Sequence, residues 1–557
     1  MALREPTSEA PREPVCPVSA IPTTFSWPTQ GCTPWGANVQ LESPAPPLLY
    51  ADHFARHARQ RVWKSAVWSL LVAAILGASF GFSPVAPLVL LTAAAIPLLF
   101  WRFPRACLYT LVASVCLFEA YPLVQPDSLT DRVPIFWNIN TIVQTYAHSD
   151  FHGIPLNLLE ILLLTAGFFS MVQAVYMRRV KVAVGPLAAV ISFFTAFVLL
   201  GWVNGLSTGG DFNFSLLEIR PPLYFLFAYL MMTNLGRDEA ARRVIVHLLI
   251  GCIAFKAVLY TYRLYGTMHG VIPDQGVGSH EEVFFFNAFF MLLLSLGLTG
   301  AQPRLRKAMW LLLPVIVTAH LACNRRSGVA ELIIALPVLM VLGYFAIPSR
   351  RKVIGIVGVI MSIILSIYYP LYRNKSGMWA QPAQAIKSAF EPDARDASSD
   401  AYRNGENQNL MATIKSAPVQ GFGFGKRMIV VADLSYAANL WEFWDRLPHN
   451  TLLWVWMRTG TIGFFAFWLM ISAILIHGCH CLRDALGPKE QSMAMFIISI
   501  VVMWLVAGAF DMGFTQVRPV LLSGFAAGLL GSLARRNPDQ EPAPSNGKRL
   551  ATTARTL

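Results

Sequence analysis

One stretch decides the fold of this chain: PRLRKAMWLLLPVIVTAHLACNRRSGVAELIIALPVLMVLGYFAIPSRRK (303–352). It holds two apolar runs, at 308–323 and 328–346, and about 20 mainly apolar residues are enough to cross the hydrocarbon core of a bilayer. Basic residues flank the pair on both outer sides, and only Asn324–Ser327 separates the runs. Because short cytoplasmic loops are enriched in Lys and Arg, the pattern predicts a helical hairpin with both basic ends in the cytoplasm.

The same alternation extends over most of the chain. Hydropathy predicts fourteen spans, at 62–81, 84–101, 105–122, 154–176, 185–203, 220–235, 243–264, 283–300, 308–323, 328–346, 353–370, 450–477, 491–510 and 517–534. Every second gap carries grouped cations: Arg102 and Arg105; Arg178, Arg179 and Lys181; Arg237, Arg242 and Arg243; Arg304, Arg306 and Lys307; Arg350, Arg351 and Lys352; Arg483 and Lys489; Arg535 and Arg536. The alternate gaps carry few cations, so we expect them to face the opposite side of the membrane.

The composition agrees with a membrane protein and argues against other classes. Hydrophobic residues make up 55% of the chain and charged residues 13%, whereas a soluble domain carries about 25% charged residues. Most of the cations behind the net charge of +13 lie beside spans, so they indicate topology in a lipid bilayer and not nucleic-acid binding. The eight Cys are scattered, which gives no disulfide framework and no standard metal site.

These patterns predict an all-α polytopic membrane protein with about 12–14 transmembrane helices and one large periplasmic loop. We expect a disordered cytoplasmic tail at 1–60, transmembrane helices 1–11 over 61–370 and the periplasmic loop at 371–448. Transmembrane helices 12–14 then cover 449–534, and a second cytoplasmic tail covers 535–557. Both termini are therefore predicted to be cytoplasmic.

Arginines on the side predicted to be external are the first candidates for chemistry. The short external gaps should lack Arg, yet they hold Arg132, Arg220, Arg325, Arg326 and, near the last span, Arg518. A guanidinium makes two parallel bonds to phosphate oxygens, which suits Arg326, Arg220 and Arg325 to binding a diphosphate at the headgroup level. The alternative is that these side chains bind lipid headgroups or cap helices.

A histidine at the end of the large loop is the candidate base. His449 and Asn450 open the span at 450–477, and a histidine at the water boundary can accept a proton near pH 7. The alternative is a loop histidine that merely precedes a helix. Upstream, GFGFG (421–425) places Gly421, Gly423 and Gly425 in a turn that we expect to contact the site. This turn is weak evidence alone, because no strand-turn-helix context makes it a phosphate loop.

Three ionisable residues are predicted inside spans. Arg458 lies nine residues after His449, about 13 Å deeper at helical rise and half a turn out of phase, so we expect it not to share the site of His449. Lys256 and Glu331 also need a partner or a cavity at such depth. The sequence assigns no role to any of the three.

The order of these motifs resembles a known family. RSGVA (326–330) before a span, a long external loop, SAPVQGFGFG (416–425) and HNTLLWVWMRTGTIG (449–463) are similar to the core of the O-antigen ligase and Wzy-type polymerase superfamily. The resemblance covers roughly 185–530 and is strongest at 416–463. Arg458 departs from the family, in which an acidic residue is common at that position.

The resemblance implies a glycosyltransferase of the bacterial inner membrane. No metal and no cofactor are expected, because arginines can neutralise the diphosphate and the external segments show no motif that would hold a metal. Its members take glycans from undecaprenyl diphosphate on the periplasmic face. By position, the family's base corresponds to His449, and its diphosphate-binding arginines correspond to Arg326 and, less closely, Arg220. The acceptor is another lipid-linked glycan for a polymerase, lipid A-core for a ligase, or a protein.

Two other classes of function remain open from the sequence. A transporter or lipid-linked glycan flippase is the main alternative, although no internal repeat of the kind common in transporters is visible. A membrane scaffold without activity is the second. Alanine at His449 and Arg326 would leave a scaffold unaffected, which separates it from an enzyme.

Overall fold

The computed structural model describes residues 99–120, 133–147, 155–177, 183–273, 276–437 and 443–533, together with Thr130 and isolated positions before residue 99. All the helices named below belong to one of two compact units, residues 91–557. Most of the predicted spans 62–81 and 84–101 and both predicted tails lie outside the described residues.

The described part of the chain is helical and contains no strand. Its helices are α3 (Pro104–Leu117), α4 (Ile139–Ala147), α5 (Leu158–Met177), α6 (Ala188–Ser207), α7 (Phe212–Leu235), α8 (Glu239–Tyr262), α9 (Glu282–Thr299), α10 (Pro303–Ala322), α11 (Arg326–Ala346), α12 (Arg351–Tyr372), α13 (Gln381–Ser388), α14 (Ala394–Ser416), α15 (Thr451–Arg483), α16 (Pro488–Phe510) and α17 (Val517–Leu533). Among these, eight are long and apolar enough to span a membrane: α6, α8, α9, α10, α11, α12, α15 and α16. The predicted all-α polytopic class is therefore confirmed.

Each predicted span from 105 onward coincides with a helix, but two expectations need correction. Helix α7 begins at Phe212 with Asp211 as its N-cap, so Arg220 lies inside the helix and not at its outer end. Helix α15 is broken at Gly460, which has φ 70° and ψ −179°. The predicted single span at 450–477 is thus two helical segments that meet at a kink.

The core of the bundle is formed by α7, α9, α16 and α17, whose buried faces are rich in aromatic and small residues. Trp504 of α16 stacks on Phe225 of α7 with ring centroids 5.2 Å apart. A Cβ at Gly524 of α17 would lie 2.7 Å from the Phe225 carbonyl oxygen. Small residues let helices approach this closely when no water drives their association.

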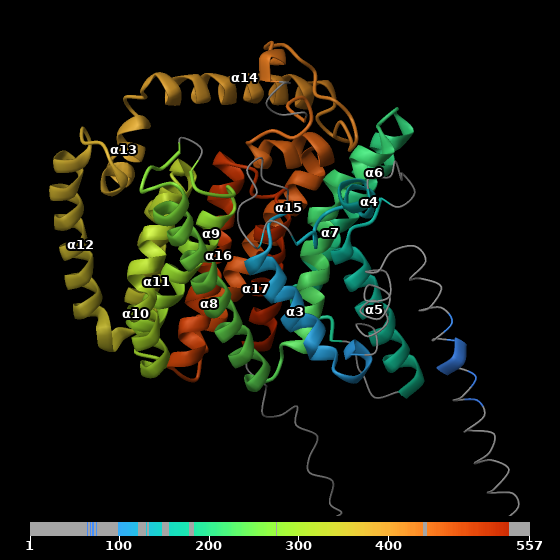
Figure 1. The fold of residues 1–557 in the computed structure, drawn as a ribbon, viewed down its shortest axis with the longest axis horizontal. Coiled ribbons are helices and arrows are strands. Elements are labelled where there is room, and N and C mark those ends of the chain that lie inside the picture. Colours follow the sequence, from blue (N-terminus) through green and yellow to red (C-terminus); the bar gives the residue numbers. More distant parts are fainter. Residues whose placement is uncertain are drawn as a thin grey trace, which may run out of the picture. The chain divides into compact units, whose positions relative to one another are not determined.

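The segment between α12 and α15 covers one end of the bundle, which we call the loop end. Figure 1 shows α12 at the periphery, α13 at its upper end and α14 lying across the bundle towards α15. Helix α14 is a 23-residue helix with Asp393 as its N-cap. It brings residues distant in sequence to the loop end of the bundle.

Candidate functional site

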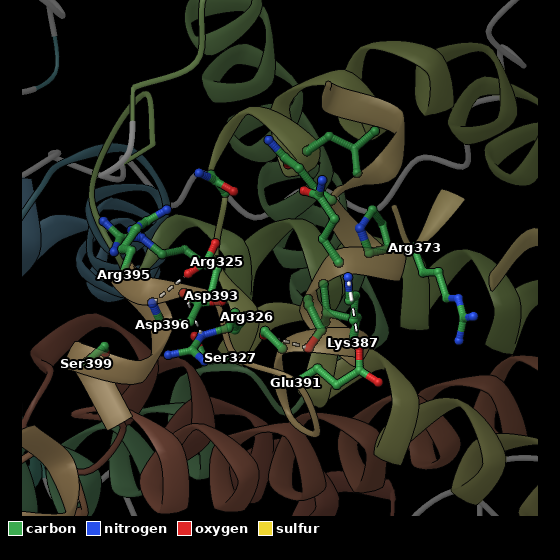
Figure 2. A pocket seen from close by; sticks show the side chains of 18 of the residues that line it. Arg325, Arg326, Ser327, Arg373, Lys387, Glu391, Asp393, Arg395, Asp396 and Ser399 are labelled. Atoms are coloured by element: carbon green, nitrogen blue, oxygen red, sulfur yellow. Dashed lines mark hydrogen bonds and ion pairs between the residues drawn. The ribbon is translucent and has the colours of Figure 1, made fainter. Parts of the chain in front are cut away.

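A polar cavity of about 410 Å³ lies at the loop end, between α10, α11, α13 and α14. Figure 2 shows Arg325, Arg326 and Arg395 on one side and Arg373 and Lys387 on the other. Its lining carries seven Lys or Arg side chains against four carboxylates, which are Arg325, Arg326, Arg373, Lys375, Lys387, Arg395 and Arg403 against Glu391, Asp393, Asp396 and Asp511. The excess of cations suits the cavity to an anionic ligand.

Arg326 is the first residue of α11, and its side chain meets two carboxylates of α14. Its Nη2 lies 3.0 Å from Oδ1 of Asp400, and its Nε lies 3.7 Å from Oδ1 of Asp396. The Arg326 side chain keeps 26% of its surface exposed. A guanidinium that already accommodates two carboxylates has the geometry to accept a bidentate anion. Arg325, its N-cap neighbour, lines the same cavity.

Asp511 brings the end of α16 into the same cavity. Its Oδ2 accepts a hydrogen bond of 3.3 Å from Oγ of Ser327 and lies 3.9 Å from Nδ1 of His280. Burial opposes ionisation of this carboxyl, but the hydrogen bond from His280 and the charges of His280 and His449 hold its pKa well below the ordinary value. Asp511 is therefore ionised at neutral pH, and its field reaches His449.

His449 precedes α15 and pairs with a carboxylate of α14. Its Nδ1 lies 2.9 Å from Oε2 of Glu406, and its backbone N–H donates to the same oxygen at 3.2 Å. Glu406 is buried at 1% exposure, whereas the His449 side chain is 24% exposed. The ring of Tyr402 meets the imidazole edge-on, with centroids 5.8 Å apart. Burial and the nearby Glu406 charge raise the pKa of Tyr402 well above its ordinary value, so this phenol stays protonated.

Helix α14 joins the arginine site to the histidine site. Asp400, which pairs with Arg326, lies six residues before Glu406, which pairs with His449, a rise of about 9 Å along a helix. A second connection passes through Asp511: its side chain contacts Ser327, next to Arg326, and its carbonyl lies 3.5 Å from Oγ1 of Thr451. The structure thus brings Arg325, Arg326 and His449 to one region.

The Asn450 side chain makes one hydrogen bond within α15 and one to α14. Its Oδ1 caps α15 by accepting from the Leu453 amide at 3.2 Å, and its Nδ2 donates to Oδ1 of Asn407 at 3.2 Å. These bonds fix the start of α15 beneath α14. Asn450 therefore lies beside the site, as expected from its place in the sequence.

Arg220 lies elsewhere, among α4, α5 and α7. Its Nε is 2.7 Å from Oε1 of Glu160, its Nη1 donates to Oδ1 of Asn138 at 3.1 Å, and its Nη2 donates to the Pro155 carbonyl. All three guanidinium nitrogens are thus engaged within the protein. Arg220 does not line the cavity of Arg326. Its described contacts join α7 to α5, to the residue before α4 and to the segment between α4 and α5.

The glycine-rich turn packs into the bundle, away from the cavity. Gly421, Gly423 and Gly425 all have positive φ, between 80° and 85°. A Cβ at Gly423 would lie 2.5 Å from Cα of Gly205 in α6. The turn follows Pro418, whose carbonyl accepts the Thr461 amide at 2.8 Å. Backbone groups freed by the kink at Gly460 are thereby satisfied, as buried membrane segments require.

Arg458 explains why the turn is held there. Its Nη2 lies 2.5 Å from Oε1 of Glu218 in α7, and both side chains are fully buried. Its Nη1 donates to the Gly423 carbonyl at 2.8 Å, and its Nη2 to the Lys426 carbonyl at 3.0 Å. Arg458 thus ties α7, α15 and the turn together, apart from His449, as the helical phase predicted.

The other intramembrane charges form two buried sets. Lys256 pairs with Glu119 and lies 3.6 Å from Glu282, and Arg518 lies 2.5 Å from the same Glu282. Glu331 accepts a hydrogen bond of 2.8 Å from Asn287 and makes no contact with Arg326 in the described structure. Neither Lys256 nor Glu331 lines the cavity of Arg326.

Three site residues were missed by the sequence analysis: Glu406, Asp400 and Asp511. Asp400 and Glu406 lie in a polar stretch that resembles many solvated loop helices, and only contact with Arg326 and His449 distinguishes them. Asp511 was hidden at the end of an apolar span. An acidic residue directly after a span, on the side predicted to be external, was the available signal.

The site was compared with known proteins. Residues 308–468 match a family model described as O-antigen ligase. This segment contains Arg325, Arg326, Glu406 and His449, but not Asp511. An O-antigen ligase of Salmonella typhimurium (strain LT2) is 27% identical over 185 residues. The resemblance to the O-antigen ligase and Wzy-type superfamily is therefore confirmed.

These similarities cover part of each protein. The match to the Salmonella protein spans 32% of this chain and 43% of that protein's length. The family-model match covers the region that holds the arginine and histidine sites. The activity, substrates and partners of the whole chain remain to be inferred from the site.

Proposed function

We propose that the protein is a glycosyltransferase that moves a glycan from undecaprenyl diphosphate to an acceptor on the periplasmic side of the bacterial inner membrane. Arg325 and Arg326 would bind the diphosphate in the cationic cavity, and His449 would be the general base. The observation that carries the proposal is that one helix, α14, contacts both Arg326 and His449. The match to the O-antigen ligase model over the same residues supports it.

The proposed chemistry follows from a cationic arginine site, which suits the leaving diphosphate, and from a histidine that can accept the acceptor's proton. The acceptor hydroxyl gives its proton to Nε2 of His449 as its oxygen forms a bond to the anomeric carbon. The bond between that carbon and the diphosphate oxygen breaks, and the diphosphate takes the electron pair. Arginines stabilise the charge that develops on this leaving group. The imidazolium then returns its proton to water.

Metal independence is part of the proposal. Two guanidinium groups, Arg325 and Arg326, supply positive charge where a diphosphate would otherwise need a divalent cation. The cavity's further cations, such as Arg395 and Lys387, add to this field. Transfer in the presence of EDTA, at the rate measured without it, is the expected result, and inhibition that Mg²⁺ reverses would contradict it.

The acceptor is proposed to be a glycan-bearing lipid. The name of the Salmonella relative, O-antigen ligase, favours lipid A-core over a second lipid-linked glycan. Purified protein in proteoliposomes, given one donor and either acceptor, would separate a ligase from a polymerase by the mass of the product. Protein glycosylation would give no product with either lipid acceptor.

His449→Ala tests the enzyme class against the transporter. Loss of a general base lowers the rate by about 10²–10⁴-fold, so we expect inserted protein, little product and accumulated donor. His269→Asn is a matched control, because His269 is exposed, lies outside the cavity and has φ 51°, which Asn tolerates. Full product formation by His449→Ala would reject the site and favour transport.

A further inference from the structure

We propose that Glu406 is a positioning residue that fixes the tautomer and orientation of His449, so that Nε2 is the atom that takes the acceptor's proton. This inference rests on the proposed function and explains why one particular ring nitrogen of His449 acts as the base. Glu406 touches neither diphosphate nor acceptor in this scheme. It acts through the imidazole.

The geometry at His449 leaves one ring nitrogen available. Both oxygens of Glu406 lie within 3.2 Å of Nδ1, at 2.9 Å for Oε2 and 3.2 Å for Oε1. An ionised carboxylate only accepts hydrogen bonds, so Nδ1 must carry the hydrogen. In a neutral imidazole the lone pair then resides on Nε2. A base that is oriented by a third group is the arrangement found in many nucleophile-activating sites.

The surroundings hold Glu406 in place. The carboxylate is buried on α14, and the ring of Tyr402, one turn earlier, packs against the imidazole. One turn later, Asn409 binds the loop at 431–432 through its Oδ1, which accepts from the Val431 and Ala432 amides at 2.8 Å each. Glu406 also accepts the backbone N–H of His449, so both ring and main chain are fixed by one side chain.

The charged and titratable groups that face His449 come from three elements. Helix α14 supplies Glu406 and Tyr402. The end of α16 supplies Asp511, whose charge interacts with His449, and the segment before α9 supplies His280, which contacts Asp511. Of these groups, Glu406 makes the described ion pair with the His449 ring. Its replacement should therefore have the largest effect on how the imidazole is held.

Glu406→Gln tests the proposal, because Gln keeps the size of the side chain but can accept or donate a hydrogen bond. Either tautomer of His449 then becomes possible. We expect kcat to fall by up to about 10⁴-fold, the loss seen when a base is held in the wrong tautomer, while KM for the lipid-linked donor stays unchanged.

Two companion variants exclude a purely structural role. Asn407→Ala removes the neighbouring contact between α14 and the start of α15 without touching the imidazole, so it should lower kcat far less than Glu406→Gln does. Glu406→Asp keeps the charge but is one methylene shorter, so it should recover part of the activity lost in Glu406→Gln. Equal loss in Asn407→Ala and Glu406→Gln would overturn the proposal.

A double-mutant comparison separates this inference from the proposed function. In a His449→Gln background, Glu406→Gln should lower the residual rate by less than about 3-fold, because coupled residues are non-additive. A further loss as large as that in the wild-type background would show that Glu406 acts independently. If His449→Ala is inactive while Glu406→Gln has normal kcat, only the inference fails. If His449→Ala is active, the proposed function fails with it.

Discussion

At the scale of single residues, Arg326 is where the shape of the cation matters. Lys in its place keeps the charge but loses the planar fork that binds two oxygens at once. We expect Arg326→Lys to lower transfer by roughly 10²-fold, the effect of removing one stabilising donor from a transition state. Product formed per amount of inserted protein is the measurement. Arg427→Lys is the control, because Arg427 is a largely exposed arginine paired with Asp445.

Replacement of Asp400 should have the opposite effect and improve binding of the donor. Its carboxylate occupies the guanidinium of Arg326, so it competes with an incoming diphosphate. Asp400→Asn should therefore lower KM for the donor several-fold and leave kcat little changed. The KM of a short-chain lipid-linked donor is the measurement. A higher KM would show instead that Asp400 orients Arg326 for binding.

At the scale of elements, the pair of Arg458 and Glu218 holds α15, α7 and the glycine-rich turn together. Both side chains are fully buried, and removal of one partner leaves an uncompensated charge, which costs about 3–5 kcal/mol. Arg458→Ala should therefore lower the thermal unfolding temperature of the detergent-solubilised protein. Arg483→Ala, at the exposed end of the same helix, should not. An unchanged unfolding temperature for Arg458→Ala would mean that the turn is held by its other contacts.

The helices themselves were predictable, and the reason is physical. A long apolar run can satisfy its backbone in lipid only as a helix, so hydropathy located α6, α8, α9 and the later spans. The kink at Gly460 was not predictable, because it depends on the Pro418 carbonyl and the turn at 421–425. Helix α14 was missed as a site element for the same reason. Its Asp400 lies 74 residues from Arg326 in the sequence, and its Glu406 lies 43 residues from His449, so no local pattern connects the helix to either partner.

The candidate site could be predicted in part. Arg326 stood out because a cation on the external side of a span is unfavourable unless it has a function. His449 stood out because it is a titratable side chain at the boundary of a span. Arg220 stood out equally, yet its partners Glu160 and Asn138 are polar residues from distant segments that no local pattern connects to it. Sequence signals of this kind identify unusual residues but not their partners.

At the scale of the whole molecule, the charge alternation predicts the orientation in the membrane. Ser399, which lines the cavity, should be periplasmic, and Ser545 should be cytoplasmic. With Cys16, Cys32 and Cys479 replaced by Ser, Ser399→Cys should react with an impermeant thiol reagent in whole cells. Ser545→Cys should react only after the inner membrane is permeabilised. The reverse pattern would overturn the topology and the proposed side of transfer.

The position of α14 across the loop end has a mechanical consequence. Its first half is tied to the bundle by Asp396 and Asp400, through Arg326, whereas its second half is tied by Glu406 and Asn409. A ligand that binds Arg326 in place of Asp396 and Asp400 breaks only the contacts of the first half of α14. The contacts of Glu406 and Asn409 then still hold the second half in place. Amide hydrogen exchange at 394–402 should then quicken on donor binding while exchange at 406–416 stays slow, so the start of α14 can move without disturbing the alignment of the imidazole.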